Sequence, residues 1–229
     1  MKTIMWVISM ASFVITAVVL QFMPDRVPMH YDIAGNVDRW GSKYENLIFP
    51  GLIIFIALFT SLMIGYFQRK ADRISLDKEK QEALQNKKVL EIVGVVMTSM
   101  FFIMQGFILY GAWKGALEQA KTQVVDIGKV SCVLLGAVLI ILGTVVPKSK
   151  NNKVLGFRST WSMYNDNTWE KSNRFAGIAL VISGVLTVIT GAFMKNSFAA
   201  TMVSLGYLLL SVIISLIYAR RIYLQEKKN

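Results

Sequence analysis

Six long apolar runs divide the sequence, and they constrain its fold more than any other feature. Each has about 20 residues, the helical length that crosses a bilayer core of about 30 Å. Only the fourth holds a charged residue, Lys129, and the runs cover residues 3–23, 47–67, 92–113, 127–146, 175–194 and 198–218. Backbone groups in lipid must bond within their own segment, which favours helices over isolated strands. We therefore expect an all-α integral membrane bundle with six transmembrane helices.

The composition agrees with a membrane protein. Of the 229 residues, 54% are hydrophobic and 17% are charged, and the charges gather between the runs. The first run has no small-residue cleavage pattern before Met23, so we expect an uncleaved span rather than a removed signal peptide. The single cysteine, Cys132, lies inside the fourth run and excludes an intrachain disulfide.

Lysine and arginine are shared unevenly between the two predicted sides of the membrane. The side with both termini carries 18 of these 25 residues, and the other side carries seven. Positively charged flanks stay in the cytoplasm, so both termini are predicted to be cytoplasmic. This topology accounts for the net charge of +11. The cations alternate with the spans instead of forming one stripe, so the bilayer is the expected partner and direct nucleic-acid binding is not expected.

The runs and their connections are predicted to form a single membrane domain with three parts. Residues 1–68 form a two-span hairpin with an external loop, residues 69–91 a cytoplasmic charged connection, and residues 92–229 a four-span region. The charged connection is rich in good helix formers and has no Gly or Pro. It is expected to extend the third span as a solvated helix.

The outer connection, residues 24–46, has distinctive turn chemistry. Its two prolines, including Pro28, favour extended backbone because proline lacks an amide hydrogen and restricts the residue before it. Gly35 tolerates positive φ and predicts a turn. Trp40 is expected near the lipid headgroups, where amphipathic aromatic residues gather.

The same connection holds the chain's only histidine, His30, which is followed by the carboxylates of Asp32 and Asp38. Such a group could bind a metal or respond to pH near the usual histidine pKa of about 6.5. One histidine is a poor basis for a zinc site, so no metal or other cofactor is expected. The favoured interpretation is structural, with an aspartate capping the turn and His30 bonding to backbone. A peptide-recognition role for this face is compatible with it.

The inner connection, residues 147–174, gathers aromatic, amide and arginine side chains. Asn167 followed by Glu170 predicts a helix start with a capping box. Interfacial anchoring would explain the tryptophans, but Trp and Arg also dominate many binding surfaces. Both explanations stay open for Arg158, Trp161, Asn165, Asn167, Trp169, Asn173 and Arg174.

The middles of the spans contain no Asp, Glu, His, Lys or Arg. Ion-coupled pumps and intramembrane enzymes place such residues there. The most polar group is Gln105, and the span glycines are expected to serve helix contacts. No phosphate loop, metalloprotease helix or triad partner is present, so an enzyme is not expected. A small-solute transporter or channel with Gln105 in its path is the alternative to a binding role.

Two loops resemble known sequences. Residues 23–43, MPDRVPMHYDIAGNVDRWGSK, are similar to the signature of a small membrane domain of unassigned function. Residues 156–177, GFRSTWSMYNDNTWEKSNRFAG, resemble the signature of the SdpI family, in which that small domain commonly precedes the inner motif. Asn173 departs from the pattern, because many relatives have histidine there. A mechanism that needs this histidine is therefore not implied.

The resemblance implies a function. The family is named for a bacterial immunity protein that protects the producing cell from its own secreted toxin peptide and holds a cytoplasmic ArsR-type repressor at the membrane. It implies a plasma-membrane protein whose toxin-facing residues are Pro28, His30, Gly35, Asp38, Trp40 and Gly41, to which we add Asp32. Its cytoplasmic, partner-facing residues would be Gly156, Arg158, Trp161, Trp169, Lys171, Arg174 and Gly177, to which we add Asn165. The sequence names neither the toxin nor the repressor.

Overall fold

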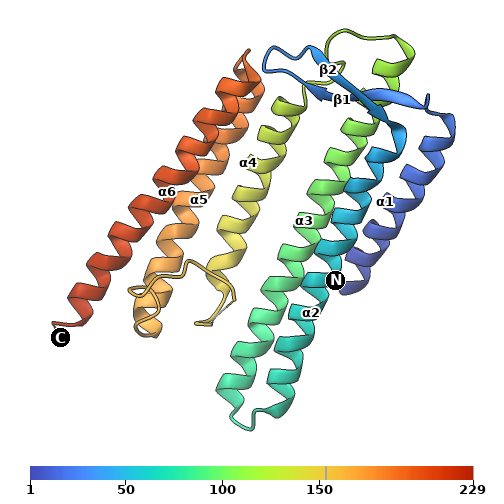
Figure 1. Cartoon of the computed structure of the whole chain (residues 1–229). Helices are drawn as coiled ribbons and strands as arrows, with labels where there is room; N and C mark the ends of the chain where they lie inside the picture. Colours follow the sequence, from blue (N-terminus) through green and yellow to red (C-terminus); the bar gives the residue numbers. More distant parts are fainter. Residues whose placement is uncertain (153, 229) are drawn as a thin grey trace.

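The computed structural model describes residues 1–152 and 154–228, and long helices dominate it (Figure 1). They are α1 (Lys2–Phe22), α2 (Ile48–Arg73), α3 (Asp77–Leu117), α4 (Ile127–Val145), α5 (Asp166–Phe193) and α6 (Ser197–Glu226). All six are long and apolar enough to cross a membrane. The predicted all-α, six-span class is therefore confirmed. Short elements complete the fold: strands β1 (Arg26–Tyr31) and β2 (Val37–Ser42), and 3-10 turns η1 (Lys43–Leu47) and η2 (Val146–Lys148).

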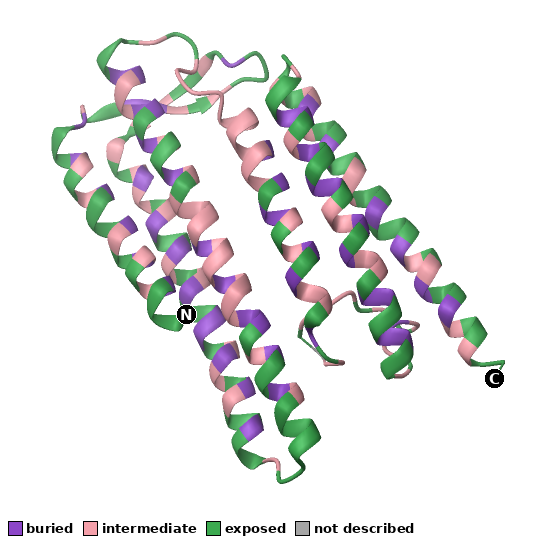
Figure 2. Cartoon of the chain, turned by 180° about the vertical axis from the view of Figure 1, so that it is seen from behind, coloured by how far each residue is buried: buried purple, intermediate pink, exposed green. Residues whose placement is uncertain are grey.

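The helices stand in two groups of three. Helices α1 to α3 pack together, α4 to α6 pack together, and α3 lies against α4 (Figure 1). The strands lie at one end, which we call the outer end, and both termini lie toward the opposite, inner end, following the topology predicted from charge. Exposed residues cover the outward helix surfaces (Figure 2). Many are large and apolar, such as Phe13, Phe55 and Leu209, as lipid-facing positions require.

Glycines set the close packing of α4 on α5. A Cβ atom built on Gly184 would lie 2.7 Å from the carbonyl oxygen of Gly136, and one on Gly177 would lie 2.5 Å from that of Gly143. The two backbones approach so closely that no larger residue fits without movement. The helix-contact role predicted for these glycines is confirmed.

Between α1 and α3, Gln105 is 2% exposed and fully engaged. Its amide nitrogen donates to the Ser12 carbonyl at 3.1 Å and to the Thr16 hydroxyl at 2.5 Å, and its oxygen accepts from the Ser12 hydroxyl at 2.5 Å. A mid-membrane amide satisfied in this way joins two helices.

The outer connection folds into an antiparallel hairpin, so two strands are added to the predicted helical fold. Val27 lies opposite Gly41, and Pro28 lies opposite Trp40. The predicted turn is present, with Gly35 at φ +85°. Trp40 packs on a buried cluster that includes Val27 and residues of α1 and α3, rather than serving only as a headgroup anchor.

Helix α3 has 41 residues and begins inside the charged connection, as predicted for an extension of the third span. Helix α5 begins at Asp166, two residues before the start that an N-cap at Asn167 would give. Its N-cap is Asn165, whose side chain accepts from the Thr168 amide at 2.8 Å, while the Thr168 hydroxyl accepts from the Asn165 amide at 3.0 Å. The cap expected at Asn167 is therefore wrong, because Asn165 and Thr168 form the reciprocal pair two residues earlier.

Candidate functional site

The hairpin is tied at its turn to the connection between α3 and α4. The Val37 amide donates to the Lys121 carbonyl at 2.8 Å, and the Gln123 amide donates to the Gly35 carbonyl at 2.7 Å. A Cβ on Gly35 would lie 2.9 Å from the Gln123 side chain, and Pro28 packs against Gly115 of α3. The hairpin is thus a fixed part of the outer end, held by backbone bonds and close contacts.

His30 and Asp38 form an exposed pair across the two strands. The His30 Nδ1 atom lies 2.7 Å from the Asp38 Oδ1 atom, and the two side chains are 65% and 44% exposed. The partner of His30 is thus a carboxylate, not the backbone group that we expected. Strand pairing brings together two residues that are eight positions apart, which spacing alone does not specify.

Asp32 holds the turn. Its Oδ1 accepts from the Asn36 backbone amide at 2.8 Å and its Oδ2 from the Asn36 side-chain amide at 2.8 Å. These hydrogen bonds, with the side-chain bond as the larger cause, lower the pKa of Asp32 below its ordinary value. Within the residues described, no three His, Cys, Asp or Glu side chains lie close enough together to hold a metal.

Two neighbouring cavities open beside the hairpin. The larger, of about 580 Å³, lies between the hairpin turn and the beginnings of α4 and α6, and its lining includes His30, Asp32 and Gly35. The smaller, of about 300 Å³, is mainly apolar and runs from Pro28 down between α2 and α3. Both are lined by Met29, Tyr31 and Ile127. Burial raises the pKa of Tyr31 above its ordinary value, in keeping with this position.

The seven candidate residues of the outer loop therefore divide by position. His30, Asp32 and Gly35 line the larger cavity, and Pro28 lines the smaller. Asp38 lines neither cavity but is hydrogen-bonded to His30. Trp40 packs on the buried cluster instead. A Cβ on Gly41 would meet the Glu45 carboxylate and, at 2.9 Å, Met29 Cγ, so a larger residue there would displace these side chains.

At the inner end, Asn173 fixes the loop before α5. Its Oδ1 accepts from the Phe157 amide at 2.6 Å, and its Nδ2 donates to the Trp169 carbonyl at 3.1 Å. Trp169 is 2% exposed, and its indole nitrogen donates to the Ser149 carbonyl at 2.9 Å. Gly156 has φ +105°, and a Cβ there would lie 2.6 Å from the Trp169 ring. Gly156 and Trp169 thus shape the loop from within.

The rest of the inner motif meets the end of α6. The Asn165 and Asn167 side chains donate to the carboxylate of Glu226, and the Lys171 Nζ atom lies 4.0 Å from it. The Arg220 guanidinium lies 5.9 Å from the Trp161 ring centroid, within cation–π range. These contacts join residues 55 to 61 positions apart, so sequence spacing gives no signal for Glu226.

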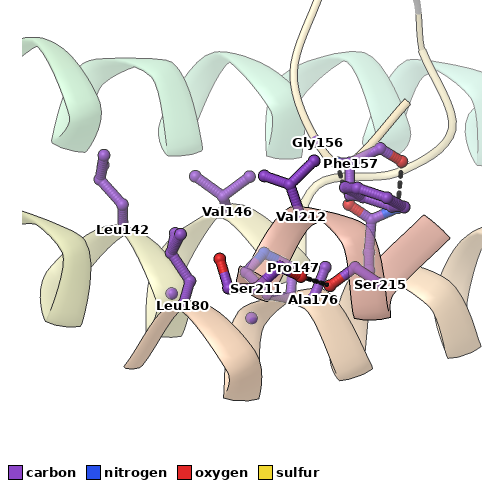
Figure 3. Close-up of a pocket in the computed structure, with 13 residues that line it drawn as sticks. Leu142, Val146, Pro147, Gly156, Phe157, Ala176, Leu180, Ser211, Val212 and Ser215 are labelled. Atoms are coloured by element: carbon purple, nitrogen blue, oxygen red, sulfur yellow. Dashed lines mark hydrogen bonds between the residues drawn. The ribbon is translucent and has the colours of Figure 1, made fainter. Parts of the chain in front are cut away.

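A third cavity, of about 220 Å³, lies under the inner loop between α4, α5 and α6 (Figure 3). Gly156 and Phe157 form one end, and Gly177 lies in its α5 wall. Arg158, Lys171 and Arg174 are exposed at the surface. The inner candidates therefore include two groups. Buried residues shape the loop and the cavity, and cations are exposed at the surface.

Two regions of the chain match known families. Residues 7–54 match DUF1648, a domain of unknown function, and residues 148–219 match the SdpI/YfhL protein family. Both resemblances are confirmed. The SdpI/YfhL region contains the inner loop, α5 and most of α6, and the other contains most of α1, the hairpin and the start of α2. With its six spanning helices, the chain is a multi-pass protein of the plasma membrane.

A curated relative extends over nearly the whole chain. The immunity protein SdpI of Bacillus subtilis (strain 168) is 22% identical over 215 residues, which cover 93% of this chain and 90% of that protein. No solved structure gives a significant match.

Proposed function

We propose that this protein is a membrane immunity protein that gives resistance to a secreted antimicrobial peptide. The observation that carries the proposal is the alignment with the immunity protein SdpI, which runs through both motif regions. A non-enzymatic role agrees with this kinship. The charge distribution supports a topology with the hairpin outside the cell and both termini in the cytoplasm. The three parts, residues 1–68, 69–91 and 92–229, then act as one membrane domain.

The toxin is proposed to bind in the two outer cavities. One is polar at its rim, at His30 and Asp32, and the other is mainly apolar and reaches toward the spans. A membrane-active peptide has both polar and apolar side chains, and a groove with this gradient suits such a ligand. Met29, Tyr31 and Ile127 border both cavities and are the proposed centre of the contact.

Helix α6 offers a route by which bound toxin could be sensed in the cytoplasm. Ser197, Phe198 and Thr201 at its start line the larger outer cavity, and Glu226 at its end holds the inner loop. A displacement at one end of a rigid helix reaches the other end. We propose that the inner motif, whose exposed cations include Lys171, then meets a cytoplasmic repressor of the ArsR type.

The test is a deletion strain challenged with secreted peptides from the same or neighbouring bacteria. We expect several-fold lower survival with at least one peptide, and recovery when the gene is restored. Ile127→Trp should fill both outer cavities and fail to restore survival, whereas Leu209→Trp, on the exposed surface of α6, should restore it. Equal survival of deletion and parent strains with every peptide would show that the immunity proposal is wrong.

The packing of Gln105 argues against the alternative of a solute channel. A polar path needs side chains that can bind a passing solute, yet the Gln105 amide is engaged by Ser12 and Thr16. Ser183 and Thr187 of α5 are buried too, but their hydroxyls have no hydrogen-bond partner among the described residues, so it is the engaged Gln105 that argues against a channel.

A further inference from the structure

The inner cavity has no part in the proposed toxin site. Its floor is α5 from Asn173 to Leu180, α4 and α6 form its walls, and Phe157 closes one end (Figure 3). The hydroxyls of Ser211 and Ser215 bond to carbonyls within α6, and the Asn173 amide bonds to the inner loop. Because these polar groups are already engaged, the lining favours an apolar occupant.

The cavity crosses the expected boundary between headgroups and hydrocarbon. The charged residues of α5 end at Arg174, and no charged residue follows until Lys195. The cavity runs from Asn173 to Leu180, seven residues further along α5, which corresponds to about 10 Å of helix. It therefore begins at the level of the basic residues and extends into the apolar layer.

Basic residues adjoin the lining at three places in the sequence. Lys148 follows Pro147, Arg158 follows Phe157, and Arg174 follows Asn173. Arg158 and Arg174 are exposed, and none of the ion pairs within residues 1–152 and 154–228 involves either of them. Arg158 and Arg174 thus each adjoin a residue that lines the cavity, and both are exposed without a carboxylate partner among the described residues. An apolar cavity next to two such arginines is complementary to a ligand with an apolar chain and an anionic head.

We propose that this cavity binds one acyl chain of an anionic phospholipid, whose phosphate is held by Arg158 and Arg174. An empty cavity forfeits dispersion contacts along its lining, and an acyl chain restores them. Arginine binds phosphate through paired N–H donors, and basic pockets between spans on the cytoplasmic side suit anionic headgroups. The bound lipid would brace the inner loop against α4 and α6.

The test uses the full chain reconstituted in nanodiscs of phosphatidylcholine with a minor fraction of phosphatidylglycerol. After transfer to mild detergent, native mass spectrometry counts the lipid that stays bound. We expect one phosphatidylglycerol per wild-type chain, and about fivefold lower retention for each of Arg158→Gln and Arg174→Gln. Ala176→Leu should displace the acyl chain, with circular dichroism and the unfolding temperature checking that the variant is folded.

Two controls separate lipid recognition from general charge. Arg73→Gln removes an exposed inner arginine at the end of α2 and should leave retention unchanged. The double variant Arg158→Lys and Arg174→Lys keeps both charges and should retain more lipid than the glutamine variants. Equal retention of phosphatidylcholine and phosphatidylglycerol by the wild type would overturn the proposal. Unchanged retention in folded Ala176→Leu would also overturn it, leaving the cavity to an apolar side chain of a protein partner.

Discussion

Asn173 closes the inner loop through both ends of its amide. Its oxygen accepts from Phe157, and its nitrogen donates to Trp169 and, at 3.4 Å, to the Phe157 carbonyl. The residue is 1% exposed, so groups left without it would be buried and unpaired. In the sequence, Asn173 is one of several polar side chains in the inner connection, and it departs from the family pattern. Its structural role depends on the positive φ of Gly156, which turns the loop back onto α5.

We predict that Asn173→Leu lowers the free energy of unfolding by about 1–3 kcal/mol, because buried backbone groups of Phe157 lose their partner. Thermal unfolding in detergent and limited proteolysis of the inner loop measure the effect. Thr160→Ala is the matched control, since Thr160 is an exposed polar residue of the same loop, without a side-chain hydrogen bond among the described residues, and should change stability by less than about 0.5 kcal/mol. Equal protease resistance of wild type and Asn173→Leu would contradict the assigned role.

Asp32 gives the hairpin turn a dependence on pH. Its pKa is lowered because Asn36 donates to the carboxylate, so the folded turn favours the ionised form. The stabilising contribution is present above the usual aspartate pKa of about 3.9 and is lost as the pH falls through the lowered value. An NMR titration should show the Asn36 amide shift moving in that acid range. The step should vanish in Asp32→Asn and persist in Asp25→Asn, and its persistence in Asp32→Asn would assign it to another group.

At the scale of elements, the backbone contact of α4 with α5 depends on glycine, whereas the contact of α5 with α6 uses larger groups. Phe175 of α5 stacks on Tyr218 of α6 with ring centroids 4.1 Å apart, and Tyr164, in the loop just before α5, meets Tyr223 edge to face at 5.0 Å. The α4–α5 pair is therefore the more sensitive to added volume. The end of α6 is held by aromatic and polar side chains that can exchange partners.

We predict that Gly184→Ala destabilises the protein by about 1–3 kcal/mol, because its Cβ would meet the Gly136 carbonyl and the helices would have to separate. Gly206→Ala in α6 is the matched control, since a Cβ there meets nothing within 4 Å. It should be neutral or stabilise by up to about 1 kcal/mol. Thermal unfolding of both variants in the same detergent gives the comparison. A similar loss at both positions would mean that general helix propensity, not the α4 contact, sets the effect.

At the scale of the whole molecule, the sequence predicted what the bilayer itself imposes. The spans follow from about 30 Å of hydrocarbon, so the apolar runs lie within α1 to α6 apart from a few terminal residues. The pairing of His30 with Asp38 requires the strand register, and the bond from Gln123 to Gly35 joins two separate connections. The contact of Asn165 with Glu226 requires the packing of α5 on α6. Such contacts depend on tertiary structure, which neither the periodicity of the sequence nor the spacing of its motifs predicts.

Helices α2 and α3 form an arm beyond the other inner ends (Figure 1). The 41 residues of α3 correspond to about 60 Å of helix, roughly twice the hydrocarbon thickness. The arm is joined to the inner loop where the Asn86 side chain accepts from the Lys150 amide at 2.8 Å. The inner loop consequently lies beside a helix pair that projects past it. A large folded protein can approach it only from the side away from the arm, whereas a narrow segment can also enter along the arm.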